Sequence, residues 1–199
     1  MDKISEPAAP AVTPSDALVA AGHAGPTAGD QAAAAKGFRY ELMRSAIYHD
    51  IRADWLGRAN RWSLFLTLIL GSGAVAALGA QLPTLGQVSG LFVAAVSALS
   101  LVWDFSGQAR THTDLKRQFY RLLADLEDGV PPEKVRAQER RLFAEEPPAL
   151  RVVMAMAENW AGGAIYGDDF DRHRIGFFRR ATAHFFPWAD AAFQPSRKP

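Results

Sequence analysis

The sequence predicts an all-α membrane protein: a long antiparallel helical hairpin of two transmembrane helices with cytoplasmic extensions, followed by short C-terminal cytoplasmic helices. Three observations lead to this fold class. Residues 63–103 contain no Asp, Glu, Lys, Arg or His. Pro83 divides this stretch into two apolar runs, because proline interrupts a helix. The segments on both sides carry apolar residues at every third or fourth position, as amphipathic helices do.

The two apolar runs predict transmembrane helices at about residues 63–80 and 85–103. A transmembrane helix needs about 20 predominantly apolar residues, and each run rises about 27 Å as a helix. Trp62 and Trp103 stand at corresponding ends of the two runs, where aromatic side chains mark the membrane–water interface. A buried helix pair in a soluble core is the alternative, but soluble cores rarely continue this long without a charge.

Two amphipathic helices are predicted next to the membrane, at Phe38–Trp62 and Phe105–Glu127. Because hairpin helices are antiparallel, we expect these extensions to be antiparallel neighbours with their apolar stripes facing each other. The first predicted stripe comprises Tyr40, Met43, Ile47, Ile51 and Trp55, and the second comprises Phe105, Ala109, His112, Leu115, Phe119, Leu122 and Leu126.

His112 lies within the second predicted stripe, where a core histidine with local hydrogen bonds is one interpretation. If Trp62 and Trp103 lie level, residues pair where their numbers sum to about 166, which places Asp54 near His112 within about one helical turn. A carboxylate partner raises the pKa of a histidine, so this pair is a candidate pH-sensitive contact. His49 falls on the polar side of its helix, where we expect it to meet solvent or another subunit.

Basic residues determine the expected orientation of the hairpin. They are concentrated in residues 36–61 and 104–121, whereas the turn at residues 81–84 carries no charge. By the positive-inside rule, both termini lie in the cytoplasm and the short turn lies outside.

The composition divides the chain into three parts. Residues 1–36 are rich in Ala, Pro and Gly and poor in large apolar residues, so we expect disorder. Residues 37–161 contain the hairpin and two further predicted helices, Glu133–Phe143 and Ala149–Trp160, the second ended by Gly162 and Gly163. Residues 162–199 form a tail with interspersed Phe, Trp and Arg, for which binding to anionic lipid and packing on the protein's own cytoplasmic helices are both open.

The sequence contains no recognisable catalytic motif. There is no cysteine and no GxSxG, P-loop, GxGxxG or HExxH pattern. Asp168, Asp169, Asp171 and His173 are the nearest approach to a metal site, but acidic residues at a helix start are explained by the helix dipole. We therefore expect no enzymatic activity, cofactor, bound metal or nucleic-acid partner, and we expect the lipid bilayer as a partner.

Small residues recur at four-residue spacing in both predicted transmembrane helices. This spacing lets helix backbones approach closely and favours association in lipid. Packing within one hairpin is one use, but two helices alone cannot cover all the small faces, so we also expect a homo-oligomer. The residues concerned are Ser72, Gly73, Ala76, Ala77, Gly86, Gly90, Ala94 and Ala98.

The order of these features resembles the SLATT domains, two-transmembrane effector domains associated with bacterial nucleotide-signalling conflict systems. The resemblance covers about residues 38–160. It is carried by YELMRSAIYHDIRADW before the hairpin, WDFSGQARTHTDLKRQFYRL after it, and EEPPAL with MAMAEN near its end. The residues singled out for the family motif or for cytoplasmic packing are His49, Asp54, Ala109, His112, Leu115, Glu146, Pro147, Pro148 and Asn159.

The resemblance implies a pore-forming effector of the bacterial inner membrane that acts in phage defence. The trigger is expected to be a separate nucleotide-sensing or nucleotide-synthesising protein, a ligand of the cytoplasmic helices, or the tail. The alternative is a non-conducting membrane scaffold that recruits a cytoplasmic partner. The predicted spans contain no ionisable residue, so a proton relay is not expected.

Overall fold

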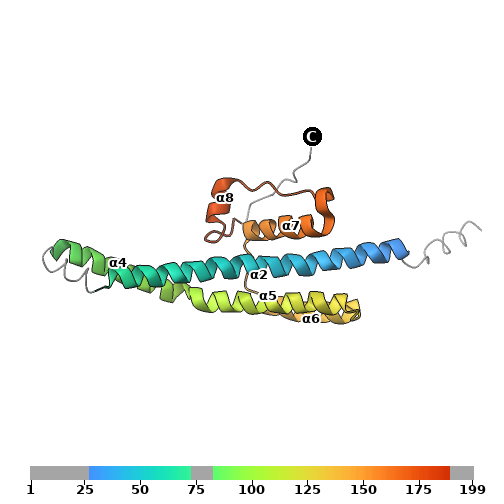
Figure 1. The fold of residues 1–199 in the computed structure, drawn as a ribbon, viewed down its shortest axis with the longest axis horizontal. Helices are drawn as coiled ribbons and strands as arrows, with labels where there is room; N and C mark the ends of the chain where they lie inside the picture. The colour runs from blue at the N-terminus through green and yellow to red at the C-terminus, as the bar shows by residue number, and fades with distance from the viewer. Residues whose placement is uncertain (1–26, 73–82, 189–199) are drawn as a thin grey trace, which may run out of the picture. The chain divides into compact units, whose positions relative to one another are not determined.

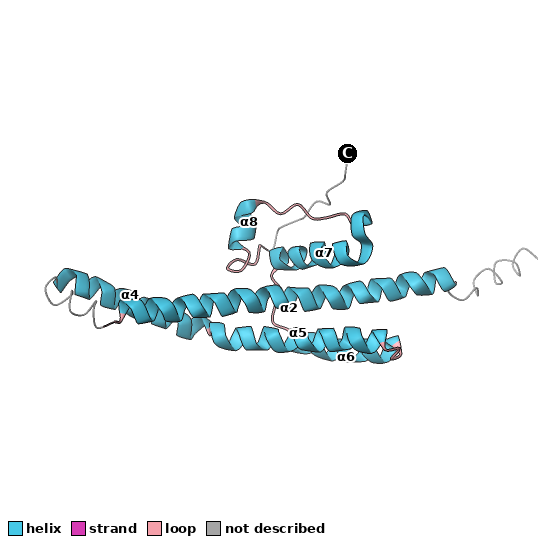
Figure 2. Ribbon diagram, in the orientation of Figure 1, coloured by secondary structure: helices cyan, strands magenta, loops and turns pink. Residues whose placement is uncertain are grey.

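The computed structural model describes residues 27–72 and 83–188, and the regular elements within these ranges are all helices (Figure 2). The chain divides into two units, residues 1–37 and 38–199. In chain order the elements are α2 (Ala28–Leu70), α4 (Pro83–Trp103), α5 (Phe105–Glu127), α6 (Pro132–Glu145), α7 (Arg151–Tyr166), the 3-10 helix η1 (Gly167–Asp169) and α8 (Phe177–Thr182).

In the first unit, the described residues form the first turns of α2. The Asp30 carboxylate accepts hydrogen bonds from the Thr27 N–H and hydroxyl at 3.0 and 2.7 Å, and the Thr27 hydroxyl accepts the Asp30 N–H at 3.2 Å. The disorder predicted for residues 1–36 is therefore wrong from Ala28 onward, because this capping box begins a helix that four alanines extend. Residues 1–26 lie outside the described residues.

In the second unit, most helix bounds agree with the predictions. α2 continues through Leu70 without a break, and α5 has the bounds predicted for the second extension. α4 and α5 are separate helices because Asp104 is left-handed, with φ 40°, and its carboxylate accepts the Gly107 N–H at 3.0 Å. Pro83 begins α4 rather than the turn before it, since proline is favoured in the first turn of a helix.

One helical stretch of the described residues, Gly86–Glu127, is long and apolar enough to cross a membrane, and only 6% of its most apolar window is buried. The first predicted span continues beyond Ser72 into residues that the structure does not describe. The two tryptophans predicted at the interface are exposed, Trp62 at 63% and Trp103 at 44%.

α2 lies between two layers of helices (Figure 1). One face packs against α5 and α6, and the other packs against α7 and the segment around α8. The first core comprises Phe38, Leu42, Ala46, Phe119, Leu122, Val135 and Leu142; the second comprises Tyr48, Val152, Val153, Ala157 and Ala183.

The predicted stripe of α5 is confirmed, whereas that of α2 meets α5 only in part: Trp55 contacts Phe105, with ring centroids 6.3 Å apart. Most of the α5 stripe is buried, including Leu115 at 3% exposure, and Ala109 is half-buried. On α2, however, Ile47 and Ile51 pack against the second core, which contains residues of α7. The face toward α5 carries Leu42 and Ala46 instead. The α2 stripe was misassigned because this helix is covered on two sides.

Ion pairs confirm the expected antiparallel register of α2 and α5. Arg39 pairs with Glu127, and the Lys116 ammonium lies 2.7 Å from the Asp50 carboxylate. The residue numbers of both pairs sum to about 166, as the level alignment of the interface tryptophans predicts.

α7 continues past the predicted stop at Gly162 and Gly163 and ends at Tyr166. A β-carbon on buried Gly162 would lie 2.4 Å from ring atoms of Phe170, so this glycine permits a close approach rather than ending the helix. The helix ends instead at Gly167, whose φ of 65° favours glycine.

Candidate functional site

A hydrogen-bonded histidine pair lies buried between α2 and α5. His49 and His112 are 0% and 3% exposed, and their Nδ1 atoms are 2.8 Å apart. The Nε2 atom of His49 is 3.1 Å from a carboxylate oxygen of Glu146, which directly follows α6. The three side chains therefore form one hydrogen-bonded chain, which we call the histidine chain, that joins α2, α5 and the end of α6.

The partners determine which ring nitrogens carry protons. An ionised carboxylate only accepts, so His49 donates from Nε2 to Glu146. A neutral His49 then has a bare Nδ1, which accepts the Nδ1–H of His112. When both rings are neutral, these bonds give each ring a single tautomer.

Aromatic side chains and the connection from α6 to α7 enclose the histidine chain. Phe119 stacks on His49 with ring centroids 5.5 Å apart, and Tyr48 meets the same ring edge-on at 5.2 Å. The Tyr48 hydroxyl accepts the N–H of Leu150 at 3.1 Å. The connection between α6 and α7 is therefore bonded to α2 at both Glu146 and Leu150.

The two prolines after Glu146 explain the backbone at this point. Glu146 has φ −71° and ψ 132°, and the residue before a proline is driven into this extended region. Pro147 thus ends α6 at Glu145, and Pro148 prevents the helix from resuming at once. The prolines therefore place Glu146 beyond the end of α6, where its carboxylate reaches His49.

Burial favours the neutral form of His112. The pKa of His112 falls to about 3, first because of burial and then because of the nearby His49 and Arg52. The arrangement joins α2, α5 and the end of α6 through hydrogen bonds.

The predicted pairing of His112 with Asp54 does not form. His112 bonds to His49, and Asp54 is exposed. Asp54 follows His49 by five residues, which places it about 140° around the helix from the face toward α5. The pKa of His112 is accordingly lowered rather than raised, and His49 is buried rather than in contact with solvent.

A second buried contact joins α2 to the residues after α8. Arg52, 8% exposed, donates to the Nδ1 atom of His184 at 3.1 Å and to its carbonyl at 3.3 Å. The His184 ring stacks on Trp55 with centroids 4.7 Å apart and planes 2° apart. Burial first, and then Arg52 and Arg58, lower the pKa of His184 to about 4.

This second contact bears on the two alternatives for residues 162–199, which are binding to anionic lipid and packing on the protein's own helices. The described residues of the tail pack on the protein's own helices through His184 and Ala183. No local pattern predicts the Arg52–His184 contact, because the partners are 132 residues apart in the sequence.

Asn159 is not part of the histidine chain. Its side chain fixes the backbone that follows α7. Its amide donates to the His173 carbonyl at 2.9 Å and accepts the His173 N–H at 2.7 Å. The Nε2 atom of His173 lies 2.8 Å from Glu158. Within residues 27–72 and 83–188, no three His, Cys, Asp or Glu side chains are arranged to hold a metal ion, so the acidic cluster near His173 has no metal-site geometry.

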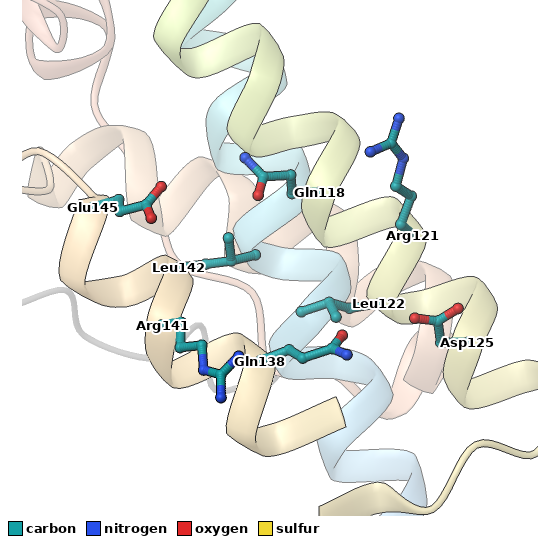
Figure 3. A pocket seen from close by; sticks show the side chains of 8 residues that line it. All are labelled: Gln118, Arg121, Leu122, Asp125, Gln138, Arg141, Leu142 and Glu145. Carbon is teal, nitrogen blue, oxygen red and sulfur yellow. The ribbon is translucent and has the colours of Figure 1, made fainter. Parts of the chain in front are cut away.

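A cleft of about 360 Å³ lies between α5 and α6. Figure 3 shows Leu122 and Leu142 pointing toward each other between the two helices, while Arg121 points away. Both leucines belong to the buried core. Two arginines and two carboxylates line the cleft, so it offers no excess charge to a ligand: Arg121, Arg141, Asp125 and Glu145.

α4 presents three different faces. The half-buried face contains Ser100, whose hydroxyl hydrogen-bonds to that of Ser63 in α2. At about 100° per residue, the exposed residues occupy two further arcs. One arc carries mainly large apolar side chains, namely Val88, Leu91, Phe92, Leu99 and Val102, together with Ala95. The other carries mainly small or polar ones, namely Gln87, Gly90, Ala94, Ser97 and Ala98, and is interrupted by Leu101 near the end of the helix.

The small residues predicted to mediate helix association divide between these faces. Gly90, Ala94 and Ala98 are exposed, and a β-carbon on Gly90 would meet nothing within 4 Å. Gly86 and Ser72 are half-buried. Gly73, Ala76 and Ala77 lie outside the described residues.

Comparison of the chain with protein-family models, with curated proteins and with solved structures finds no match.

Proposed function

We propose that this protein is a homo-oligomeric membrane effector that permeabilises the bacterial inner membrane when activated. The observation that carries the proposal is the division of the exposed surface of α4. Its large apolar face is suited to lipid acyl chains, and its face of small and polar residues is suited to close contact with another helix.

In this proposal α2 and α4 cross the bilayer as a hairpin, with both termini in the cytoplasm. The Ser63–Ser100 hydrogen bond supports contact between the two helices. Arg58, Arg61, Trp62 and Phe65 line a surface groove of about 400 Å³, and such basic and aromatic side chains are typical of the membrane–water interface.

The histidine chain would hold the closed state. It fixes α2 against α5, and these helices lead directly into the two proposed spans. An input that separates them would shift the population toward an open assembly. A shift from 1:99 to 99:1 requires about 5.5 kcal/mol of preference for the open state, which is within the range of a protein or nucleotide ligand.

The resemblance to SLATT domains supports a role in phage defence and a separate nucleotide-sensing or nucleotide-synthesising partner as the trigger. His49, His112 and Glu146 belong to the resembling segments, and they are the residues that form the buried chain.

A non-conducting scaffold is the second candidate, and one observation favours it. Five polar residues of the proposed spans are candidates to line a channel: Ser63, Thr67, Gln87, Ser97 and Ser100. Three of them bond within the protomer. The Thr67 hydroxyl donates to the Ser63 carbonyl, the Ser100 hydroxyl donates to the Val96 carbonyl, both at 2.9 Å, and Ser63 bonds to Ser100. Of these five residues, Gln87 and Ser97 are exposed, both on α4.

Ion release from liposomes that contain the purified full chain tests the proposal. The variant His49→Ala breaks the histidine chain and should increase release without any trigger. Adding Gly90→Leu should reduce both release and oligomer size in nanodiscs, whereas Val88→Leu, on the large apolar face, should change neither. Tight membranes with His49→Ala, despite an intact oligomer, would favour the scaffold.

A further inference from the structure

Exposed aromatic and basic side chains gather on the segment that contains α8. Four phenylalanines there are exposed: Phe177 at 87%, Phe178 at 69%, Phe185 at 53% and Phe186 at 57%. Arg179 and Arg180 lie between them and are also exposed. Single exposed apolar residues are ordinary, but a cluster of this kind marks an interaction surface.

The opposite side of this segment is already occupied. Ala183 is fully buried, and Ile175 and Trp188 pack against the α7 core. The guanidinium of Arg179 lies 5.8 Å from the centre of the Trp188 ring. Phe177, Phe178 and Phe186 are therefore not on the side by which this segment docks to the protein, whereas Phe185 contacts Trp55 of α2.

The position of the segment points toward the predicted interface. His184 stacks on Trp55, and the Phe185 ring meets Trp55 edge-on at 4.9 Å. Trp55 precedes Trp62 by seven residues, or about 10 Å along α2. The headgroup region extends roughly 5–8 Å beyond the hydrocarbon core, so phenylalanine side chains at this level reach it. Figure 1 shows α8 at the end of the α7 layer that is nearer to α4.

The charge of residues 172–188 indicates an anionic partner. Residues 172–188 contain four arginines and no Asp or Glu. Arg58 of α2 also lies close enough to lower the pKa of His184. Basic and aromatic residues together at the interface match a layer of anionic headgroups above acyl chains.

We infer that residues 175–186 form a peripheral contact with anionic phospholipid headgroups of the same membrane that α2 and α4 span. This inference rests on the proposed function, because it requires the transmembrane hairpin. It does not require that the hairpin conducts ions. The lipid contact would make the Arg52–His184 interaction depend on the lipid composition of the inner leaflet.

Spin labels on single cysteines test the contact, since the chain has no cysteine of its own. The full chain is placed in nanodiscs of phosphatidylcholine alone or mixed with phosphatidylglycerol. A label at Phe177→Cys should gain contact with oxygen and lose contact with a water-soluble nickel reagent only in the anionic discs. A label at Trp160→Cys, on α7 and 70% exposed, should stay in water in both.

Charge variants test the recognition. Arg180→Gln should lower the ratio of docked to undocked label about fivefold, the factor expected for one arginine near an anionic leaflet. Arg140→Gln, at an exposed position of α6, should leave the ratio unchanged.

Each other outcome overturns the inference. Water exposure of the Phe177 label in both discs excludes the contact, and equal lipid contact in both excludes recognition of anionic lipid. Burial of the label that follows protein concentration rather than lipid indicates a second copy as the partner. A label at Leu91→Cys serves as the reference for the hairpin: if it is open to water, the transmembrane arrangement itself is wrong.

Discussion

The Nδ1 atom of His49 lies 2.8 Å from the Nδ1 atom of His112, so one buried ring donates a hydrogen bond to the other. The Nε2 atom of His49 also contacts Glu146, and a neutral His49 that donates to this carboxylate accepts from His112 at Nδ1. Residues from three distant parts of the chain thus fix one another. Loss of any one leaves a buried polar atom without its partner, which is costly.

Glu146→Gln tests the acceptor end of the histidine chain. The amide oxygen of Gln still accepts the His49 proton, but a neutral acceptor contributes less than a charged one. We expect a loss of about 1 kcal/mol in the free energy of unfolding for Glu146→Gln and about 2–3 kcal/mol for Glu146→Ala. Denaturation in detergent measures both. Glu145→Gln, at an exposed neighbour, should change stability by less than about 0.5 kcal/mol; equal losses at the two positions would contradict the assignment.

Much of the fold could be predicted because it follows from local pattern. The α5 stripe and its bounds follow from three- and four-residue spacing and from Gly129 with two prolines after it. The register of α2 against α5 followed from placing Trp62 and Trp103 at the same level, and the Asp50–Lys116 pair agrees with this register.

The site could be predicted only in part, because its contacts depend on which face of α2 meets which layer. Apolar periodicity marks Ile47 and Ile51, but these face α7, and the face toward α5 contains a histidine that looked polar and solvated. Similarly, Gly162 was predicted to end a helix, because the sequence spacing does not show that Phe170 folds back onto this glycine.

Acidification should destabilise the fold below about pH 6.5. The pKa is about 3 for His112 and about 4 for His184 in the folded protein, whereas an unfolded histidine titrates near about 6.5. The unfolded state therefore binds more protons below about pH 6.5. Stability is complete above that pH and falls as the pH decreases toward the folded pKa values.

The expected loss at about pH 5 is about 2 kcal/mol for each histidine, relative to neutral pH. Denaturant titrations at the two pH values measure it. His184→Gln removes one of the two titrations, so its loss should be smaller by about 2 kcal/mol. A free energy of unfolding that does not change between neutral pH and about pH 5 would show that these rings are not held neutral.

Ser63→Cys with Ser100→Cys should form an intramolecular disulfide. The hydroxyl groups of Ser63 and Ser100 are in direct contact, so two sulfur atoms there can reach the S–S bond length of about 2 Å. Because the chain has no other cysteine, thiol labelling and mass spectrometry report this pair alone. The control is Leu64→Cys with Leu101→Cys, at positions 62% and 83% exposed, which should keep both thiols. Equal labelling of the two double variants would argue against contact between α2 and α4.

Gly162→Ala and Gly163→Ala should have opposite effects although the residues are neighbours in α7. At Gly162 the added methyl group would meet the Phe170 ring at 2.4 Å, and that ring is already packed against Tyr40 and Tyr166. Such overpacking costs about 1–3 kcal/mol. At Gly163 the nearest atom is the flexible guanidinium of Arg172 at 3.2 Å, so alanine should stabilise the helix by up to about 1 kcal/mol. Thermal unfolding in one detergent compares them, and a stabilising Gly162→Ala would mean that Phe170 does not pack on α7.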